Sequence, residues 1–204
     1  MSERPFSEQL RERCQEDWDA VVGHPFATAI IDGTADMRRY LEQDFQFVDS
    51  FTALLGAAVA CADSLEARVP YARFLGQVAT TEEKTYFHRA LAELGGDQDP
   101  VLEPVTAEFA ALMDEVRRSQ DYASIVAVLC VAEWAYLGWA SRAAQPYTGS
   151  WIHREWIELH EGPEFRAWVA FLRGELDRVG GDAVEAPFRR AVELERRFFD
   201  MAAG

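Results

Sequence analysis

The sequence predicts an all-α fold. Apolar residues recur at the three- and four-residue spacing of a helix along nearly all of the 204 residues, and the alternating pattern of a strand is nowhere sustained. Hydrophobic residues make up 49% of the chain and charged residues 27%, which is the balance of a globular protein. A chain of this length can bury its own core, so we expect residues 1–204 to form a single helical domain that needs no metal or disulfide.

Breaks in the first half of the chain come from proline and glycine. His24-Pro25 and Asp32-Gly33-Thr34 separate the first predicted helix, 6–22, from the second, 36–65. Pro70 marks the start of the third, 70–95, because proline is tolerated in a first helical turn, and Gly95-Gly96 ends it.

The second half is divided in the same way. Pro104 and Pro163 sit near predicted helix starts, and Gly180-Gly181 precedes the last helix. The remaining predicted helices are 103–119, 121–145, 150–160, 163–180 and 183–202. Such a set of long helices indicates a bundle with its ligand pocket between helices.

Charge and cysteine usage narrow the class of partner. Asp and Glu outnumber Lys and Arg by 35 to 20, and no dense basic run is present, so nucleic acid is not an expected partner. No run of about 18 apolar residues and no apolar leader segment occurs, so we expect a cytoplasmic protein without membrane contact. Cys14, Cys61 and Cys130 are odd in number and lack a CxxC, which predicts reduced thiols rather than a disulfide framework or a zinc site.

Motifs along nearly the whole chain resemble those of the TenA/thiaminase II family. The segment 40–47, YLEQDFQF, is similar to the family's YLxQDYxYL signature and follows a His24-Pro25-Phe26 that is similar to its HPF. Segment 133–139, EWAYLGW, resembles the fifth-helix motif, and Trp156-Ile157 the WI that follows. Segment 195–201, ERRFFDM, resembles the ExxFW near the end. The order and spacing of four such motifs together identify the family.

The resemblance implies a haem-oxygenase-like helical bundle, assembled as a homo-oligomer (dimer or tetramer), that binds 4-amino-2-methylpyrimidines derived from thiamin. It also implies hydrolysis at the methylene on carbon 5. The family's catalytic cysteine position is Ala132 here, and Glu133 matches the branch in which an acid replaces the thiol. That branch is associated with salvage, so the expected substrate is 4-amino-5-aminomethyl-2-methylpyrimidine or its formyl derivative rather than intact thiamin.

Asp44 is the expected ligand of the pyrimidine amino group. Asp44, Phe47 and Phe51 are three and four residues apart, which puts them on one helical face. The ring can stack on the phenyl groups while the carboxylate accepts charge-assisted hydrogen bonds. The competing interpretation is a solvated Asp on a helix whose Phe residues are core, which is the commoner arrangement for an aspartate.

Glu133 and Glu195 are the expected catalytic acids. Glu133 is the one charge in IVAVLCVAEWAYLGWA, and burial among apolar side chains should raise its pKa toward the range of a general acid or base. The alternative is an acid that reaches water at an oligomer edge or pairs with Arg142. Glu195 precedes Phe198 and lies near the similar Glu193, so on composition alone a surface salt-bridge helix is favoured, and only the ExxF match makes it a general acid/base.

The other expected substrate contacts are Tyr136, Phe47, Phe109 and His160. Tyr136 can donate its hydroxyl to the substrate, although a buried tyrosine with one satisfied hydroxyl is equally ordinary. Phe47, Phe109 and His160 stand where the cysteine branch of the family shows tyrosines, which implies a reduced hydroxyl network. A lone His at a helix end is otherwise more often structural.

Two other candidate centres are disfavoured. Cys130 lies in an apolar run without an adjacent base, which makes a thiol inert. Glu82, Glu83 and His88 lack the paired Glu-x-x-His spacing of a di-iron bundle, and no glycine-rich phosphate loop is present, so no metal and no cofactor are expected.

Three hypotheses therefore remain from the sequence. The first is an aminopyrimidine aminohydrolase, with a small-molecule pyrimidine as its partner. The second is a non-catalytic pyrimidine-binding or regulatory protein on the same fold, motivated by the missing cysteine. The third, a metal-dependent oxidase, requires bound iron.

Overall fold

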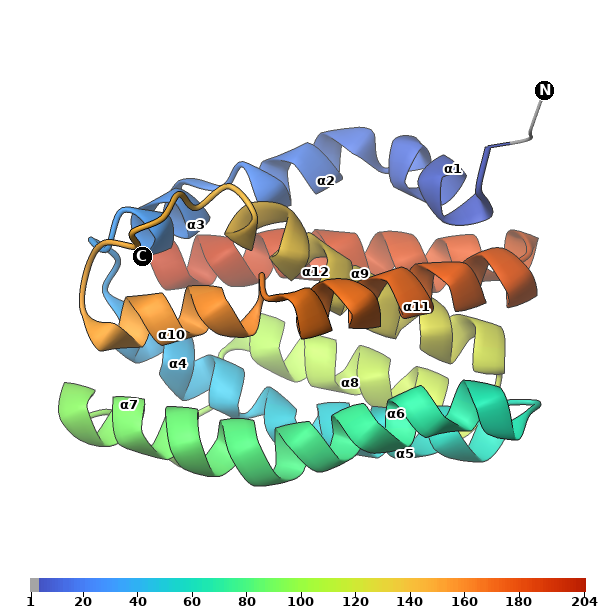
Figure 1. Cartoon of the computed structure of the whole chain (residues 1–204), viewed down its shortest axis with the longest axis horizontal. Coiled ribbons are helices and arrows are strands. Elements are labelled where there is room, and N and C mark those ends of the chain that lie inside the picture. The colour runs from blue at the N-terminus through green and yellow to red at the C-terminus, as the bar shows by residue number, and fades with distance from the viewer. Residues whose placement is uncertain (1–3) are drawn as a thin grey trace.

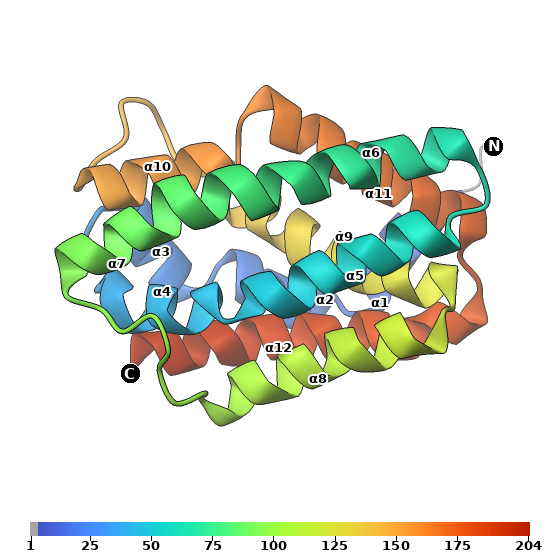
Figure 2. The same ribbon diagram turned by 90° about the horizontal axis from the view of Figure 1, so that it is seen from below.

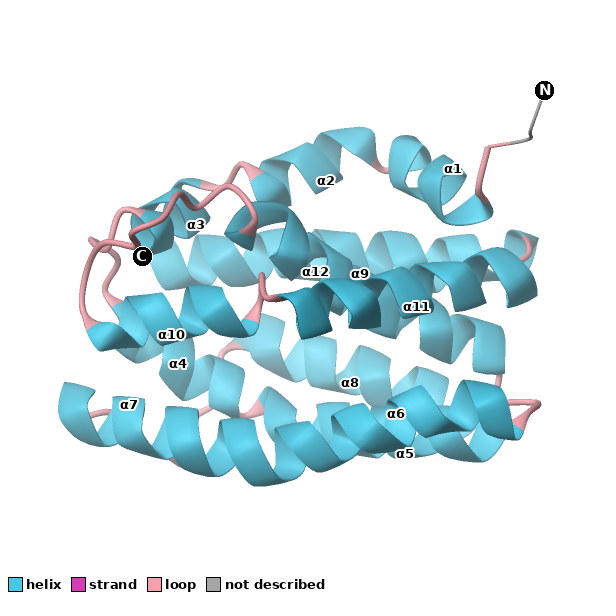
Figure 3. Cartoon of the chain, in the orientation of Figure 1, coloured by secondary structure: helices cyan, strands magenta, loops and turns pink. Residues whose placement is uncertain are grey.

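The computed structural model describes residues 4–204, with the side chains of residues 81–84 left out. Every regular element in that range is a helix (Figures 1 and 3), as the sequence predicts. The elements are α1 (Phe6–Arg13), α2 (Gln15–Val22), α3 (Pro25–Ile31), α4 (Met37–Phe45), α5 (Phe47–Cys61), α6 (Leu65–Gln77), the π-helix η1 (Val78–Phe87), α7 (His88–Leu94), α8 (Pro104–Ser119), α9 (Tyr122–Ala140), α10 (Trp151–Leu159), α11 (Pro163–Val179), the 3₁₀ turn η2 (Asp182–Val184) and α12 (Glu185–Ala203).

Helix α9 is the centre of the bundle. It packs against α11, α12, α5 and α2, and buried side chains from helices α1 to α12 join it in one hydrophobic cluster. Within residues 4–204 it is the single unbent helix that is long and apolar enough to cross a membrane, and 78% of its apolar window is buried by the other helices. Its composition is therefore that of a core helix, which buries apolar residues on all sides.

The other helices run along the length of the molecule around α9. In Figure 1 the blue helices α1 to α3 lie above it and the cyan α5 lies below, while α10 and α11 pass in front and the red α12 lies behind. Figure 2 shows α5 and the rod of α6, η1 and α7 lying side by side on the lower face. Helix α1 and the C-terminus lie toward opposite ends of the long axis in both views.

Three predicted boundaries differ from the structure in the N-terminal part. The first helix, predicted over 6–22, is interrupted at Cys14, whose φ of −114° and ψ of 20° lie outside the helical range. The segment expected to be only a break contains α3, because Pro25 occupies the first helical position and the His24 ring accepts a hydrogen bond from the Phe26 N–H. The second helix, 36–65, is divided at Gln46 into α4 and α5, which meet at a bend of 42°.

The expectation that Pro70 starts a helix is wrong. Ser64 caps α6 by accepting a hydrogen bond from the Ala67 N–H at 3.1 Å, so the helix begins at Leu65 and Pro70 lies inside it. Helical backbone then continues without interruption through η1 to Leu94. Pro104 and Pro163 do occupy the first turns of α8 and α11, as predicted.

The helix predicted over 121–145 ends earlier, at Ala140. The loop that follows is held against the turn after α3, where Thr148 Oγ1 donates to the Ile31 carbonyl at 3.1 Å. A Cβ on Gly33 would lie 2.4 Å from the Gly149 Cα, and both glycines have positive φ angles of 71° and 81°. Only glycine allows this backbone approach, so the loop packs closely here instead of extending the helix.

Candidate active site

One cavity of about 100 Å³ lies between the helices around α9. Side chains from α4, α5, η1, α8, α9, α10 and α12 line it. The lining includes all seven residues that the sequence singled out: Asp44, Phe47, Phe109, Glu133, Tyr136, His160 and Glu195. Side chains from segments 150 residues apart therefore meet around one space.

The bend between α4 and α5 positions Asp44 and Phe47. Both residues line the cavity although they belong to different helices, since the bend at Gln46 lies between them. Gln43 holds this part of α4 in place: its Nε2 donates to the Val101 carbonyl at 3.0 Å, and its Oε1 accepts from the Thr106 hydroxyl at 2.8 Å. The buried glutamine of the YLEQD segment is therefore a structural clamp between α4 and the start of α8.

Glu133 points into the cavity from the middle of α9, with 8% of its surface exposed. Its Oε2 accepts a hydrogen bond at 3.0 Å from the indole N–H of Trp168 on α11. The alternative pairing with Arg142 is wrong, because that guanidinium donates instead to the Val22 carbonyl at 2.6 Å. Glu133 is thus buried against an aromatic donor.

Glu195 is the most deeply buried acid of the cavity. It is 3% exposed, whereas Glu193 is on the exposed side of α12, so the surface salt-bridge interpretation is wrong for Glu195. Burial raises its pKa well above the ordinary value of 4.5, and the negative charges of Asp44 and Glu133 raise it further. A carboxyl in this environment retains its proton at a pH where exposed carboxyls have lost theirs.

The described part of the cavity lining is rich in acids. Among the lining residues whose side chains the structure describes, three are acids and none is Lys or Arg. The same negative charge contributes to the raised pKa values of two nearby tyrosines, Tyr40 and Tyr136, after burial itself. The three acids suit a ligand that offers N–H donors.

A hydroxyl and indole network supports Tyr136. The hydroxyl oxygens of Tyr136 and Tyr40 lie 2.8 Å apart, and the indole N–H of Trp156 donates to the Tyr40 oxygen at 3.2 Å. Tyr40 is fully buried behind the cavity, and Trp156 lines it. The Tyr136 ring is therefore fixed with its hydroxyl bonded to a group outside the cavity.

His160 is a neutral acceptor. Its Nδ1 lies 2.8 Å from the Trp156 carbonyl oxygen, which can only accept, so the ring proton is on Nδ1 and Nε2 is the acceptor. Burial lowers the pKa of the ring to about 4, so it remains uncharged at neutral pH. Its centroid lies 4.9 Å from that of Tyr136 and 4.4 Å from that of Trp156.

Aromatic rings form the remaining walls. Phe47 packs edge to face with Phe109 at 5.3 Å and with Phe198 at 5.0 Å. Phe51 and Phe87 also line the space. A flat ring placed here meets phenyl faces and edges, which is the usual surrounding of a stacked heterocycle.

The cysteines lie outside this set. Cys130 is fully buried and absent from the cavity lining, and burial raises its thiol pKa above the usual range, as expected of an inert thiol. Ala132, the position that the family resemblance aligned with a cysteine, does line the cavity. Within the described residues all three cysteines are free thiols.

The structure bears only partly on the Glu82, Glu83 and His88 cluster. The side chains of Glu82 and Glu83 lie outside the described residues. Among the side chains that are described, no group of three or more His, Cys, Asp and Glu is arranged to hold a metal ion.

Sequence reasoning missed Trp156 in the cavity lining, and Tyr40 and Trp168 behind it. Tyr40 and Trp156 stand inside the quoted motifs, four residues before Asp44 and four before His160, and that helical spacing could have suggested them. Trp168 stands in no motif and is 35 residues from its partner Glu133, so no local pattern could have found it.

The chain is similar to named relatives and to solved structures. Two curated relatives are named aminopyrimidine aminohydrolase. The one from Halalkalibacterium halodurans is 23% identical over 97% of this chain and 95% of its own length. The one from Bacillus subtilis is 25% identical over 88% of this chain and 79% of its own length. Solved structures of TenA homologues from Pyrococcus furiosus and P. horikoshii superpose with TM-scores of 0.85 at 18% and 20% identity, covering at least 97% of each chain. This likeness shows that the fold is that of the TenA proteins. The model of the TENA/THI-4/PQQC family matches residues 11–203, so the chain belongs to that family.

Proposed function

We propose that this protein is an aminopyrimidine aminohydrolase of thiamin salvage, which converts 4-amino-5-aminomethyl-2-methylpyrimidine and water into the hydroxymethylpyrimidine and ammonia. The observation that carries the proposal is the meeting of Asp44, Glu133 and Glu195 around one aromatic cavity. The names of the two curated relatives support the same reaction.

Binding uses the flat shape of the ring and its N–H groups. Phe47 and Phe109 supply apolar contact, and the Asp44 carboxylate accepts from the 4-amino group or a protonated ring nitrogen. Tyr136 and the Nε2 of His160 offer further hydrogen bonds.

Chemistry divides between the two buried glutamates. Glu195, kept protonated by burial, gives its proton to the amine of the substrate bound as the free base. The C–N bond breaks and ammonia leaves with the bonding electron pair, while positive charge develops at the methylene carbon. The 4-amino group delocalises that charge, and the Glu133 carboxylate stabilises it.

Water completes the reaction. It adds to the methylene carbon and loses a proton to the carboxylate left on Glu195, which restores the acid for the next turnover. Glu133 shares this proton traffic, because two acids in one cavity titrate as a coupled pair. The sum is R–CH₂–NH₂ plus H₂O giving R–CH₂–OH plus NH₃, without a thiolate at position 132.

Incubation of the purified protein with 4-amino-5-aminomethyl-2-methylpyrimidine tests the proposal. Ammonia and the hydroxymethylpyrimidine should appear in equal amounts, and the formylaminomethyl analogue in a parallel reaction decides whether the formyl group must be removed first. No product from either compound between pH 6 and about 9 would contradict the proposal. If the pyrimidine then raises the melting temperature without being converted, the chain is a pyrimidine-binding or regulatory protein.

We also propose that the protein works in the cytoplasm as a homo-oligomer. The free state of the described cysteines supports a reducing compartment. Large apolar side chains that are exposed in the single chain, including Leu65 at 73% and Val101 at 93%, support association with further copies. Light scattering of the purified protein gives the mass, and a monomeric mass at micromolar concentration would contradict the association.

A further inference from the structure

We propose that Trp168 is a positioning residue of the reaction, which holds the Glu133 carboxylate in its anionic form and in one orientation toward the substrate. The proposal rests on the function proposed above. Trp168 does not line the cavity and acts only through Glu133.

The hydrogen bond is buried at both ends. The indole N–H reaches Glu133 Oε2 at 3.0 Å, with Trp168 6% exposed and Glu133 8% exposed. An indole N–H only donates and does not titrate near neutrality, so it offers the same donor at every working pH. A carboxylate accepts this bond more strongly than a carboxylic acid does, so the contact favours the charged form of Glu133.

The indole is itself held rigidly. Its ring stacks on Phe74 with centroids 4.3 Å apart and an interplanar angle of 19°, and a second stacked ring, Phe171, lies at 5.7 Å. Tyr71 meets the indole edge to face at 5.5 Å and 89°. Neighbours that fix the ring plane also fix the direction of its N–H, and this reduces the freedom of the carboxylate that receives it.

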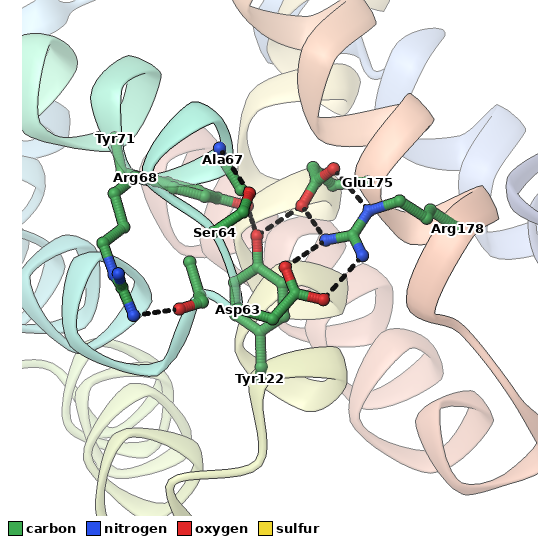
Figure 4. A network of polar contacts seen from close by, with 9 residues as sticks. Asp63, Ser64, Ala67, Arg68, Tyr71, Tyr122, Glu175 and Arg178 are labelled. Atoms are coloured by element: carbon green, nitrogen blue, oxygen red, sulfur yellow. Dashed lines mark hydrogen bonds and ion pairs between the residues drawn. The ribbon is translucent and has the colours of Figure 1, made fainter.

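A polar network anchors Tyr71 in turn (Figure 4). Its hydroxyl lies 3.2 Å from that of Tyr122, which donates to Glu175 at 2.6 Å. Glu175 is bound by Arg178, which also reaches Asp63 with two hydrogen bonds of 2.8 and 3.0 Å. The support behind Trp168 therefore joins α6, α9, α11 and the turn before α6.

Trp168→Phe tests the proposal, because phenylalanine retains an aromatic ring for the stack and removes the N–H. We expect kcat for the aminopyrimidine to fall about 10-fold while KM changes by less than about 2-fold, as for loss of a hydrogen bond to a charged group. Trp151→Phe is the matched control, since it removes another indole bond to a carboxylate, 2.7 Å from Glu93, away from the cavity. Unchanged kcat in Trp168→Phe, or an equal loss in the control, would overturn the proposal.

The pH dependence of kcat in Trp168→Phe distinguishes an effect through Glu133 from a general loosening of the packing around the indole. Without the indole donor the acidic limb of kcat should move to higher pH, because Glu133 holds its proton longer. Of the groups in the cavity, Asp44, Glu195 and Tyr136 keep their own environments, and so does His160 with its pKa of about 4. Outside it, Cys130 and Arg173 lie beside α9 and are unchanged. A profile reduced in height without a shifted limb would contradict an effect through Glu133.

Indole proton resonances in NMR spectra test the hydrogen bond from Trp168 to Glu133 without a measurement of turnover. The Trp168 Nε1–H signal, identified by its loss in Trp168→Phe, should move upfield in Glu133→Ala, whereas the Trp151 signal should not. If Trp168→Phe fails to fold, the Trp168 signal is identified in the wild type by its proximity to the ring protons of Phe74 and Tyr71 and is followed in Glu133→Ala instead. A Trp168 signal that does not move in Glu133→Ala would overturn the proposal. If the signal moves but the wild-type protein shows no turnover, the proposed function is overturned and the hydrogen bond is retained.

Discussion

Two buried glutamates, one on α11 and one on α12, have opposite protonation preferences. Glu195 in the cavity is 3% exposed and its pKa is raised, whereas Glu175 on α11 is 9% exposed and its pKa is lowered. Burial acts in the same direction on both. The difference is Arg178, whose guanidinium bonds Glu175 at 2.7 Å, while Glu195 shares its cavity with two further acids.

The comparison shows that the neighbours of a buried glutamate decide whether it stabilises the fold or can act as a proton donor. An arginine partner keeps Glu175 ionised and makes it part of a lock between helices. Acidic neighbours and an apolar wall keep Glu195 protonated, which costs folding free energy and supplies a proton donor. The cavity is therefore the place where the fold retains an unfavourable charge arrangement.

The largest effect should come from Glu195→Gln. Removing the proton donor is expected to lower kcat about 1,000-fold, in the range of general acid–base catalysis, while the melting temperature is kept or raised because one buried acid is gone. Steady-state kinetics and thermal unfolding measure the two quantities. Glu193→Gln, two residues away on the exposed side of α12, is the control and should behave as wild type.

Glu133→Gln should follow with a loss of about 100-fold in kcat, since the amide is isosteric but cannot stabilise positive charge at the methylene. Circular dichroism should show an unchanged helical fold. Activity within a few-fold of the wild type would remove Glu133 from the mechanism.

The sequence was informative about these acids for a local reason. Glu133 interrupts a long apolar run, which predicted its burial, whereas Asp44 and Glu195 were expected at the site only because their segments resemble the family's motifs. The bend at Gln46 was not predictable, because the apolar pattern passes through it without a glycine or proline. Pro70 misled because the cap at Ser64 started its helix earlier.

Partners distant in sequence were beyond prediction. Glu175 and Asp63 meet through Arg178, and Trp168 meets Glu133, only because α11 packs on α9 and α6. Helical spacing could have suggested the i,i+3 pair of Glu175 and Arg178, but it carries no information about the bonds from Arg178 to Asp63 or from Trp168 to Glu133. The residue types of the site could thus be predicted, but not its electrostatics.

Glu175→Gln should affect stability and leave turnover intact. Loss of the charged hydrogen bonds to Arg178 and Tyr122 is expected to reduce the free energy of unfolding by about 2 kcal/mol. Urea unfolding at pH 7 measures it, and kcat well below the melting temperature should stay within about 2-fold of the wild type, because Glu175 reaches Trp168 only through Tyr122 and Tyr71. A large fall in kcat with unchanged stability would reverse the assignment of the two glutamates.

The pH dependence of stability should differ in sign between the two sites. Glu175 has a folded pKa below the ordinary 4.5, so its contribution is present above about pH 4.5 and is lost as pH falls through the lowered value. Glu195 has a folded pKa above the ordinary 4.5. It therefore leaves the free energy of unfolding unchanged below pH 4.5, where it is protonated in both states, and lowers that free energy increasingly as pH rises above 4.5.

Unfolding series from pH 3 to 8 on both Gln variants test these signs. The deficit of Glu175→Gln relative to wild type should shrink toward low pH, and the advantage of Glu195→Gln should grow toward high pH. Parallel curves for wild type and either variant would contradict the corresponding pKa direction.

The smallest effect is expected from Cys130→Ala, which removes the buried thiol from the middle of α9. Cys130 is fully buried, lies outside the cavity lining and has a raised thiol pKa, so it supplies neither a thiolate nor a substrate contact. Turnover should stay within about 2-fold of the wild type, while stability falls by about 1 kcal/mol from the small void. A loss of kcat comparable to that of Glu133→Gln would make Cys130 the nucleophile and require α9 to turn that residue toward the cavity. Alkylation distinguishes the cases as well, because a buried neutral thiol should resist iodoacetamide until the protein unfolds.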